Sequence, residues 1–280
     1  MAQADSGYFA NGLPYNRLGN GPRTLVVFTG LAFENKPMAG MELRASRGAV
    51  QFLEQDYTVW VVNRRPGLRR GATIADMADD YAETIRSEFS GPVDVMGISS
   101  GGSIALQFAL DHPDLIRHLV IYSAASRLGE VGRTLQRELS ALAARRRWGD
   151  AFSMLMSFLF LPRSGIGRTL TRPVRGAFYV MGRLVVRVED PSDVVVTVSA
   201  EDSFDVGDRL GEIRVPTLVV AGANDPFYER ELFEATASGI PGARLHLESD
   251  GGHVPTGEGV RSAIRTFLDE PAPQSSTVVP

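Results

Sequence analysis

A Gly-x-Ser-x-Gly pattern centred on Ser99 is the first feature of this sequence that could carry chemistry. It follows the short apolar run 93–96 and leads into a segment with helical spacing. A serine between a strand and a helix lies on a tight turn, and Gly97 and Gly101 are small enough to let neighbouring chain pass close to it. The turn exposes the hydroxyl group, and the helix directs free N–H groups, such as that of Ser100, toward negative charge beside it. We therefore predict that Ser99 is a nucleophile, although a plain Gly/Ser loop would give the same five letters.

A histidine is needed to activate such a serine, because a hydroxyl group is a weak nucleophile at neutral pH. The sequence has four histidines. His112 lies at a helix end, His118 begins an expected strand and His246 lies inside another, so a structural or surface role is the simplest interpretation of each. His253 instead lies in the glycine-rich loop between the last expected strand and the last expected helix. We predict that His253 is the base that accepts the serine proton.

An aspartate must orient the imidazole, and Asp225 is the candidate with the best position. It follows the apolar strand 217–221, and loops after parallel strands gather at the edge of the sheet where Ser99 is expected. The alternative interpretation is a turn-forming aspartate, which is common before proline. Weaker candidates for the orienting acid are Asp250, Asp202 and Asp205.

Two backbone N–H groups are expected to stabilise the negative oxygen that forms when the serine attacks a carbonyl group. One is the N–H of Ser100, at the start of the helix after the nucleophile. The other should come from the loop 29–33, after the strand 25–28, and we predict the N–H of Leu31. A simple turn around Gly30 is the alternative interpretation of that loop.

An alternation of buried strands and amphipathic helices would position these residues. Strands are expected at 24–28, 57–62, 93–96, 118–122, 217–221 and 244–247. The apolar runs 24–28 and 57–62 are typical of strands covered on both faces of a parallel sheet. Segments with helical periodicity lie between or after them, at 41–55, 74–85, 103–111, 229–238 and 258–268. Asn11-Gly12 predicts a hairpin, and Thr73 with Asp76 predicts a capping box. The pattern predicts an α/β fold, with a mostly parallel sheet covered by helices on both faces.

The alternation is interrupted between residues 127 and 200, where helical stretches are expected at 131–147, 151–161 and 174–188. We interpret 127–200 as a helical insertion between two parts of a core domain, 1–126 and 201–270, with a flexible tail at 271–280. The insertion contains twelve arginines against six acidic residues. Solvated helix faces would explain this excess, and attraction of an anionic ligand or membrane surface is the alternative.

Apolar side chains of the insertion could line a substrate pocket, because the segment 152–160 is apolar around most of a helix. Packing of the insertion against the core would give the same pattern. A pocket of this kind would accept a hydrophobic acyl or alcohol group of small to medium size. The residues that we predict at the pocket are Phe33, Met154, Phe158, Phe178 and Val254.

Composition excludes several other classes of protein. No cysteine is present, which excludes disulfides, thiolate nucleophiles and cysteine-ligated metals, and no cluster of metal ligands is apparent. A net charge of −4 argues against a nucleic-acid partner. Residues 1–7 contain an acid and neither a basic nor an apolar stretch, so we expect no secretion signal. No apolar run approaches the roughly 20 residues of a membrane span, so we expect a cytoplasmic protein without stable membrane insertion. Its oligomeric state, monomer or homodimer, stays open.

With the chain order Ser99, Asp225, His253, the sequence resembles the α/β-hydrolase superfamily from about residue 8 to residue 268. The segment 63–67, Asn-Arg-Arg-Pro-Gly, lies where relatives often carry Asp-x-Arg-Gly. The segment 213–216, before the strand that leads to Asp225, is also similar to the corresponding segment of the family. The resemblance implies an eight-stranded, mostly parallel sheet and a helical cap formed by the insertion. It also implies hydrolysis through an acyl-enzyme, without a metal or a cofactor.

Two departures from the family pattern are Thr29-Gly30, in place of the usual His-Gly, and the unusual segment 34–36. The expected activity is hydrolysis of a carboxylic ester with a small to medium hydrophobic group, like that of a carboxylesterase or lipase. Other members of the superfamily use the same three residues as carbon–carbon bond hydrolases, peptidases or cofactor-free perhydrolases, so these reactions remain alternatives. A weakly catalytic ligand-binding receptor is an alternative of a different class.

Overall fold

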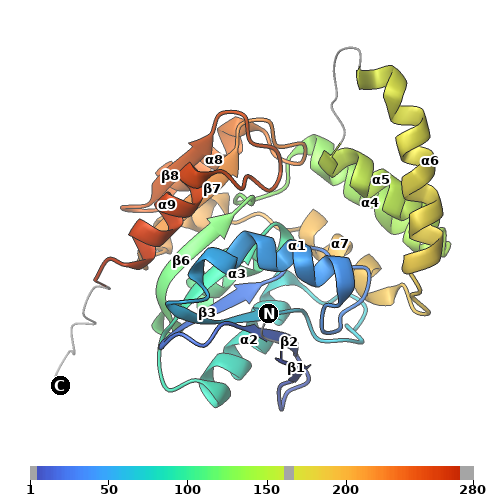
Figure 1. Cartoon of the computed structure of the whole chain (residues 1–280). Helices are drawn as coiled ribbons and strands as arrows, with labels where there is room; N and C mark the ends of the chain where they lie inside the picture. Colours follow the sequence, from blue (N-terminus) through green and yellow to red (C-terminus); the bar gives the residue numbers. More distant parts are fainter. Residues whose placement is uncertain (1–4, 161–166, 272–280) are drawn as a thin grey trace.

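The computed structural model describes residues 5–160 and 167–271, and its centre is an eight-stranded sheet (Figure 1). The strands are β1 (Asp5–Tyr8), β2 (Pro14–Leu18), β3 (Arg23–Phe28), β4 (Tyr57–Val62), β5 (Val93–Ile98), β6 (Ile116–Tyr122), β7 (Thr217–Gly222) and β8 (Arg244–Glu248). Their order in the sheet is β1-β2-β4-β3-β5-β6-β7-β8. The pairs β1–β2 and β2–β4 are antiparallel, and the other neighbours are parallel. The predicted α/β fold with a mostly parallel sheet is therefore confirmed.

Helices cover both faces of this sheet. Those on the core are α1 (Gly40–Val50), α2 (Ile74–Glu88), α3 (Ser100–Asp111), α8 (Arg230–Gly239) and α9 (Glu258–Leu268). Leu25 and Val27 of β3 pack in one hydrophobic cluster with α1 and α9, whereas Val26 and Phe28 pack in another with α2, α3 and α8. Because alternate residues of a strand enter separate clusters, the buried strands have continuous apolar sequences. Within residues 5–160 and 167–271, no helix is long and apolar enough to cross a bilayer.

Two predictions from local turn chemistry are confirmed. The Asn11-Gly12 turn joins β1 to β2, and Gly12 has a φ of 89°, a left-handed conformation that costs glycine little. The hydroxyl group of Thr73 accepts the N–H of Asp76 at the start of α2, and the Asp76 carboxylate accepts the N–H of Thr73. The hairpin turn and the start of α2 therefore both lie where local sequence favours them.

Helices occupy the segment between β6 and β7, where the sequence analysis expects an insertion. They are α4 (Glu130–Ala144), α5 (Trp148–Phe160), α6 (Gly167–Val185) and α7 (Ser192–Asp202). In Figure 1, α4, α5 and α6 stand to one side of the sheet, and α6 is outermost. The third helix begins at Gly167 rather than at residue 174, so Pro173 lies inside it. The tail expected at 271–280 lies outside the described residues from 272 onward.

The helix α7 is not predicted from the sequence, because its valine run at 194–196 favours a strand when considered alone. In the structure, Val194 packs in a cluster with Trp148, while Val196 and Ala200 join the main hydrophobic core. Burial of these side chains outweighs their local propensity. The boundary expected between residues 200 and 201 therefore falls inside α7.

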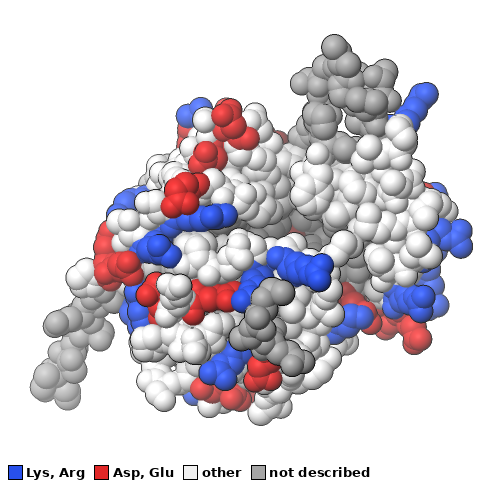
Figure 2. Space-filling model, in the orientation of Figure 1, with Lys and Arg blue, Asp and Glu red and all other residues white. Residues whose placement is uncertain are grey.

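Some arginines of the insertion form ion pairs on its surface. Arg137 pairs with Asp202 at 2.8 Å, and Arg147 pairs with Asp150 at 3.0 Å. Figure 2 shows basic side chains along the outer edge of the insertion, next to a few acidic ones. Exposed pairs of this kind contribute little to stability, because solvent screens them. Part of the excess of arginine over acidic residues therefore lies on solvated helix surfaces.

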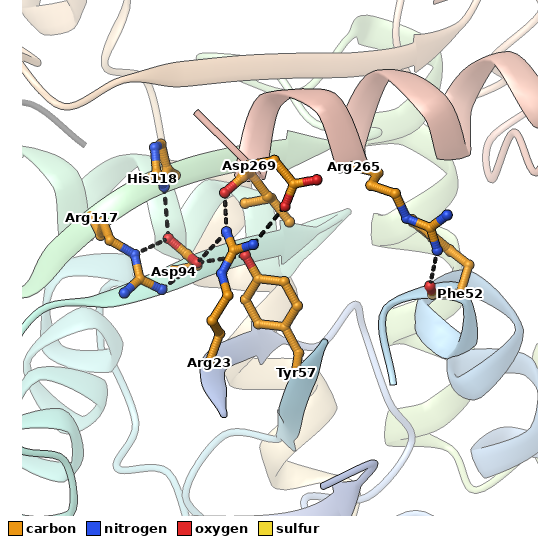
Figure 3. Close-up of polar contacts among 9 residues, drawn as sticks. Arg23, Phe52, Tyr57, Asp94, Arg117, His118, Arg265 and Asp269 are labelled. Carbon is orange, nitrogen blue, oxygen red and sulfur yellow. Dashed lines mark hydrogen bonds and ion pairs between the residues drawn. The ribbon is translucent and has the colours of Figure 1, made fainter. Parts of the chain in front are cut away.

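At the amino end of β5, Asp94 forms the buried polar cluster drawn in Figure 3. Its Oδ1 lies 2.8 Å from His118 Nδ1 and accepts Arg117 Nε at 2.9 Å, and its Oδ2 accepts the Tyr57 hydroxyl at 2.9 Å. Burial alone would raise the pKa of Asp94. Hydrogen bonds from these three side chains, led by His118, and the charge of Arg117 together hold the pKa below its ordinary value. Asp94 and Ser99 thus lie at opposite ends of one strand.

Candidate active site

Ser99 lies on the turn between β5 and α3, in a backbone conformation that is rare for a residue other than glycine. Its φ is 52° and its ψ is −124°. Close packing explains why this strained turn persists. A Cβ added to Gly101 would lie 2.1 Å from the carbonyl oxygen of Phe28, and one added to Gly97 would lie 2.5 Å from the Gly101 carbonyl oxygen. These two glycines let α3 approach the strand ends and hold the serine at the carboxyl edge of the sheet.

The structure brings Ser99, His253 and Asp225 together in one hydrogen-bonded line. His253 Nε2 lies 2.9 Å from Ser99 Oγ, and His253 Nδ1 lies 2.8 Å from Asp225 Oδ2. The other Asp225 oxygen accepts the N–H groups of Phe227 at 2.7 Å and Tyr228 at 3.3 Å. The Asp225 side chain is fully buried, and only 5% of the His253 side chain is exposed. The carboxylate is therefore fixed, and the imidazole contacts it through one nitrogen while the other nitrogen faces the serine.

Packing between the loops after β7 and β8 sets this arrangement. The N–H of Asn224 donates to the carbonyl group of Gly251 at 2.9 Å. Gly222 approaches the same loop so closely that an added Cβ would meet the Gly252 carbonyl oxygen at 2.2 Å. Two loops from different parts of the sequence are thus held as one unit, which keeps the aspartate beside the histidine.

The weaker candidates for the acid lie elsewhere. Asp202 forms an ion pair with Arg137, and Asp205 lies 3.8 Å from Arg127. Asp250 is exposed on the loop before the histidine. Across residues 5–160 and 167–271, none of these three carboxylates forms a hydrogen bond with the predicted base.

Aromatic rings surround the imidazole. The Phe227 ring centroid lies 4.4 Å from that of His253, and the Tyr228 ring is nearly parallel to the imidazole at 6.3 Å. Phe158, from α5 of the insertion, lies 5.8 Å from Phe227. This predicted pocket residue is therefore one ring away from the predicted base. The rings exclude water from one side of the imidazole, while the serine side remains half-buried.

Two backbone donors face no protein acceptor near Ser99. Within the described parts of the chain, neither the Leu31 N–H nor the Ser100 N–H donates a hydrogen bond. The loop that carries Leu31 lies beside the nucleophile, because a Cβ added to Gly30 would be 3.4 Å from Ser99 Cβ and 4.0 Å from Ser99 Oγ. Free N–H groups at such a position are suited to donate hydrogen bonds to a developing oxyanion.

The other predicted pocket residues lie at different distances from the site. Phe33 is half-buried and contacts Trp148 of α5 edge to face, with ring centroids 5.7 Å apart. Val254 follows the histidine and is 43% exposed. Met154 packs against the main core, and Phe178 is half-buried on α6 without a described contact to the three central residues. Figure 2 shows a hollow with mostly uncharged side chains between the insertion and the body of the molecule.

A second hollow, of about 540 Å³, lies within the insertion and does not include the three central residues. Trp148 lines it, and the same residue contacts Phe33 beside the loop of Leu31. Its wall also contains polar and charged groups from α5, α6 and the turn before α5, namely Arg146, Arg147, Asp150, Tyr179 and Arg183. The basic side chains of the insertion therefore gather in part around this hollow.

Asn63 supports the loop beside the nucleophile, a role that the sequence did not predict. The Thr29 hydroxyl donates to Asn63 Oδ1 at 3.2 Å, and Asn63 Nδ2 donates to the carbonyl groups of Glu34 at 3.2 Å and Lys36 at 3.3 Å. An asparagine can accept and donate at once, whereas an ionised aspartate only accepts. The adjacent Arg64 is buried behind the same loop.

Glu201 forms a second unpredicted feature, a buried polar cluster behind the nucleophile. Its Oε1 accepts the Ser103 hydroxyl at 3.1 Å, and its Oε2 accepts the Gln136 amide at 3.0 Å. Burial raises the pKa of Glu201 above its ordinary value and outweighs these hydrogen bonds. Ser103 lies one helical turn after Ser99. No local signal predicts the cluster, because it needs the tertiary packing of α7 and α4 against α3.

The geometry is suited to acyl transfer. It combines a hydroxyl group, a base in hydrogen-bonding contact with that hydroxyl, a carboxylate that orients the base, and free N–H donors beside the hydroxyl. Among the described residues, no group of three or more His, Asp or Glu side chains is arranged to hold a metal ion.

Known proteins with similar sequences and structures include several hydrolases. The chain is 28% identical over 212 residues to a Rhizobium rhizogenes protein named as a carbamate hydrolase, RutD, covering 73% of this chain and 79% of that one. It is 26% identical over 254 residues to a Pseudomonas 2-hydroxy-6-oxononadienedioate/2-hydroxy-6-oxononatrienedioate hydrolase, covering 85% and 84% of the two chains. The enol-lactonase structure from Burkholderia xenovorans matches the fold with a TM-score of 0.73 and 21% identity, over 94% of this chain and all of that one.

A family model described as the alpha/beta hydrolase family matches residues 13–262. This range begins before β2 and ends within α9, so it includes the strained turn, both loops that meet beside it and the helical insertion. The chain belongs to the alpha/beta hydrolase family.

Proposed function

We propose that this protein is a serine hydrolase that cleaves carboxylic esters with a small to medium hydrophobic group. The observation that carries the proposal is the continuous hydrogen-bonded line from Ser99 Oγ, through both nitrogens of His253, to the buried carboxylate of Asp225. A histidine bonded at both nitrogens in this way is suited to take a proton from the serine while the aspartate stabilises the imidazolium. The similarity to other hydrolases supports the same class of reaction.

In the proposed mechanism, His253 Nε2 accepts the hydroxyl proton as Ser99 Oγ attacks the ester carbonyl carbon. The carbonyl oxygen becomes negative and is held by the N–H groups of Leu31 and Ser100. Collapse of the tetrahedral intermediate breaks the bond to the alcohol, which leaves with the proton from the imidazolium. Water then donates a proton to His253 and attacks the acyl-enzyme, which releases the acid and restores the serine hydroxyl. Asp225 keeps the imidazole in the required tautomer throughout.

The preference for a hydrophobic group is inferred from the rings near the predicted base. Phe158 reaches toward His253 through Phe227, and Phe33 lies on the loop that carries one proposed oxyanion donor. Hydrophobic and aromatic side chains with a few polar groups are typical of sites for small organic ligands. A second candidate reaction is carbamate hydrolysis, which is favoured by the similarity to a protein named as a carbamate hydrolase. It would use the same attack on a carbonyl carbon.

Replacement of Ser99 tests the proposal. The Ser99→Ala protein should lose p-nitrophenyl butyrate hydrolysis by about 10⁴-fold or more, because no other group supplies the attacking oxygen. Ser87→Ala is a matched control, since Ser87 is exposed on α2. Circular dichroism and thermal unfolding should show that both variants are folded. Retention of turnover by the Ser99→Ala protein would overturn the proposal.

A substrate panel distinguishes the reaction types. We expect activated esters to be cleaved faster than p-nitrophenyl carbamates, vinylogous diketones or prolyl amides, and faster than peracid formation from hydrogen peroxide and a carboxylic acid. Faster cleavage of the carbamates would favour the second candidate. Tight binding of a ligand with negligible turnover, unchanged by Ser99→Ala, would instead favour a receptor.

A further inference from the structure

Arg64 carries a buried positive charge that has no role in the mechanism described above. The residue is only 1% exposed. Burial lowers the pKa of its guanidinium group, yet arginine keeps its proton in proteins. Within residues 5–160 and 167–271, no carboxylate forms an ion pair with it, unlike the neighbouring Arg65, which pairs with Asp80 at 2.6 Å. A buried cation without an ion pair is costly, so its position requires an explanation.

The guanidinium group is bonded to the loop beside the nucleophile. Arg64 Nη1 donates to the carbonyl group of Thr29 at 3.0 Å, and Nη2 donates to the carbonyl group of Gly30 at 2.9 Å. These carbonyl groups belong to two successive peptide units. The planar fork of an arginine can bind both at once, which a lysine cannot do in the same geometry. Arg64 therefore fixes the orientation of two peptide planes rather than one.

The second of these planes contains the proposed oxyanion donor. The carbonyl group of Gly30 and the N–H of Leu31 belong to the same peptide unit, and in a trans peptide they point in opposite directions. No cis peptide bond occurs in the described chain. When Arg64 holds the Gly30 carbonyl group, the Leu31 N–H must point away from the guanidinium group.

A device that fixes this plane is needed because Gly30 is conformationally permissive. If the plane turned over, the carbonyl oxygen of Gly30 would replace the Leu31 N–H, and a partial negative charge would lie near the forming oxyanion. Gly30 is close enough to Ser99 for this to matter, since its added Cβ would lie 4.0 Å from Ser99 Oγ. Hydrogen bonds to both carbonyl groups oppose such a turn.

We propose that Arg64 is a positioning residue for the oxyanion hole, which holds the Leu31 N–H toward the reacting oxygen and adds a positive charge behind it. The inference rests on the proposed function. The carboxylates of Glu201, Asp193 and Glu42 attract Arg64 electrostatically, but none forms an ion pair with it, so part of its charge remains available where a negative oxygen develops. In surroundings that exclude water, a fixed charge acts more strongly than it would in solvent.

Substitution of Arg64 tests this role, with its sequence neighbour as the control. Arg64→Met keeps most of the side-chain length and removes the charge and both donors, and we expect kcat for p-nitrophenyl butyrate to fall by about 10²–10³-fold. The KM should change by less than about threefold, because the interaction strengthens in the transition state. Arg64→Lys should lie between Arg64→Met and the wild type. Arg65→Met should resemble the wild type.

An inhibitor pair separates a positioning role from general loosening of the fold. A trifluoromethyl ketone forms a tetrahedral oxyanion on the serine, whereas the matching methyl ketone mainly binds as a ground-state mimic. In Arg64→Met, the inhibition constant of the trifluoromethyl ketone should rise by nearly the factor by which kcat/KM falls, and that of the methyl ketone should stay nearly unchanged. Equal weakening of both inhibitors, or wild-type kcat in a folded Arg64→Met protein, would overturn the inference.

Two further comparisons keep the outcome decisive. If Arg64→Met does not fold, Arg64→Lys is judged in its place, with at least a tenfold loss of kcat and a parallel loss of trifluoromethyl ketone affinity expected. Wild-type behaviour of a folded Arg64→Lys protein would then overturn the inference. Failure of the proposed function is distinguishable, since the wild type would then hydrolyse the ester no faster than Ser99→Ala.

Discussion

Buried polar groups at the two ends of β5 differ in whether they have charged partners. At the amino end, the Asp94 carboxylate has hydrogen-bond donors on both oxygens and two arginines nearby (Figure 3). At the carboxyl end, the N–H groups of Leu31 and Ser100 have no protein acceptor, and no carboxylate pairs with Arg64, among the described residues. The comparison indicates that the buried carboxylate at the amino end has direct charged partners, whereas the buried guanidinium group at the carboxyl end donates only to carbonyl groups within the described chain, near the place where new negative charge would form.

The largest effect after loss of Ser99 itself is expected from Asp225. In Asp225→Asn, an amide replaces the carboxylate that accepts from His253 Nδ1, so the imidazole would adopt the wrong tautomer for proton transfer. We expect kcat for ester hydrolysis to fall by about 10⁴-fold without loss of the fold. Asp250→Asn is the control, because Asp250 is exposed on the same loop as the histidine. The proposed roles would be contradicted if steady-state kinetics showed the larger loss for Asp250→Asn.

The amino end of β5 should affect stability instead of catalysis. Asp94→Asn would leave Arg117 and His118 without their carboxylate. Removal of one partner from a buried ion pair costs about 3–5 kcal/mol, and we expect about 3 kcal/mol because Arg117 is partly exposed. Urea unfolding at pH 7 measures this difference. The folded variant should keep kcat within about twofold, and a kcat loss like that of Arg64→Met would remove the distinction between the two ends.

The same variant predicts how the stability difference depends on pH. The pKa of Asp94 is lowered in the folded protein, so its contribution is fully present above the ordinary aspartate value of about 3.9 and is lost as pH falls through the lower, folded value. The difference in unfolding free energy between wild type and Asp94→Asn should be constant near neutral pH and should shrink in acid. If this difference in unfolding free energy grew in acid, the pKa of Asp94 would be raised instead of lowered by folding.

The smallest expected effect on stability comes from Glu201, and its dependence on pH is opposite to that of Asp94. Burial raises the pKa of this carboxyl group, so the wild type should lose stability as pH rises above the ordinary glutamate value of about 4.3, until the folded value is passed. Glu201→Gln cannot ionise, and its amide can still contact Ser103 and Gln136. Its stability relative to wild type should therefore increase with pH in denaturant titrations. A relative stability that is independent of pH would argue against a raised pKa.

Features controlled by local chemistry were predictable from the sequence. The turn at Ser99 is marked by glycines that close packing requires, and the start of α2 by the reciprocal bonding of Thr73 and Asp76. The apolar runs of β3, β4 and β7 predict buried parallel strands, since both faces of these strands are covered, whereas β8 is only partly buried. Elimination among four histidines was enough to select the one that lies beside Ser99.

Features that depend on distant contacts were not predictable. The valines of α7 are helical because they are buried, and local propensity gives the wrong indication. Two arginines stand side by side in the sequence, and only the fold shows that Arg64 is buried against two carbonyl groups while Arg65 is paired at the surface. The pocket residues also depend on the fold, since Phe158 approaches the imidazole through an intervening ring, whereas Phe178 has no described contact to the three central residues.

The central claim is that Ser99 is an activated nucleophile, and covalent labelling with a fluorophosphonate tests it most directly. Such a probe reacts readily with a serine whose proton is taken by a neighbouring base, and hardly at all with an ordinary hydroxyl group. After digestion, mass spectrometry should find a single modified site in the peptide that contains Ser99, with the label absent from Ser99→Ala and strongly reduced in Asp225→Asn. An unlabelled wild-type protein, or a label on another residue that persists in Ser99→Ala, would contradict the claim.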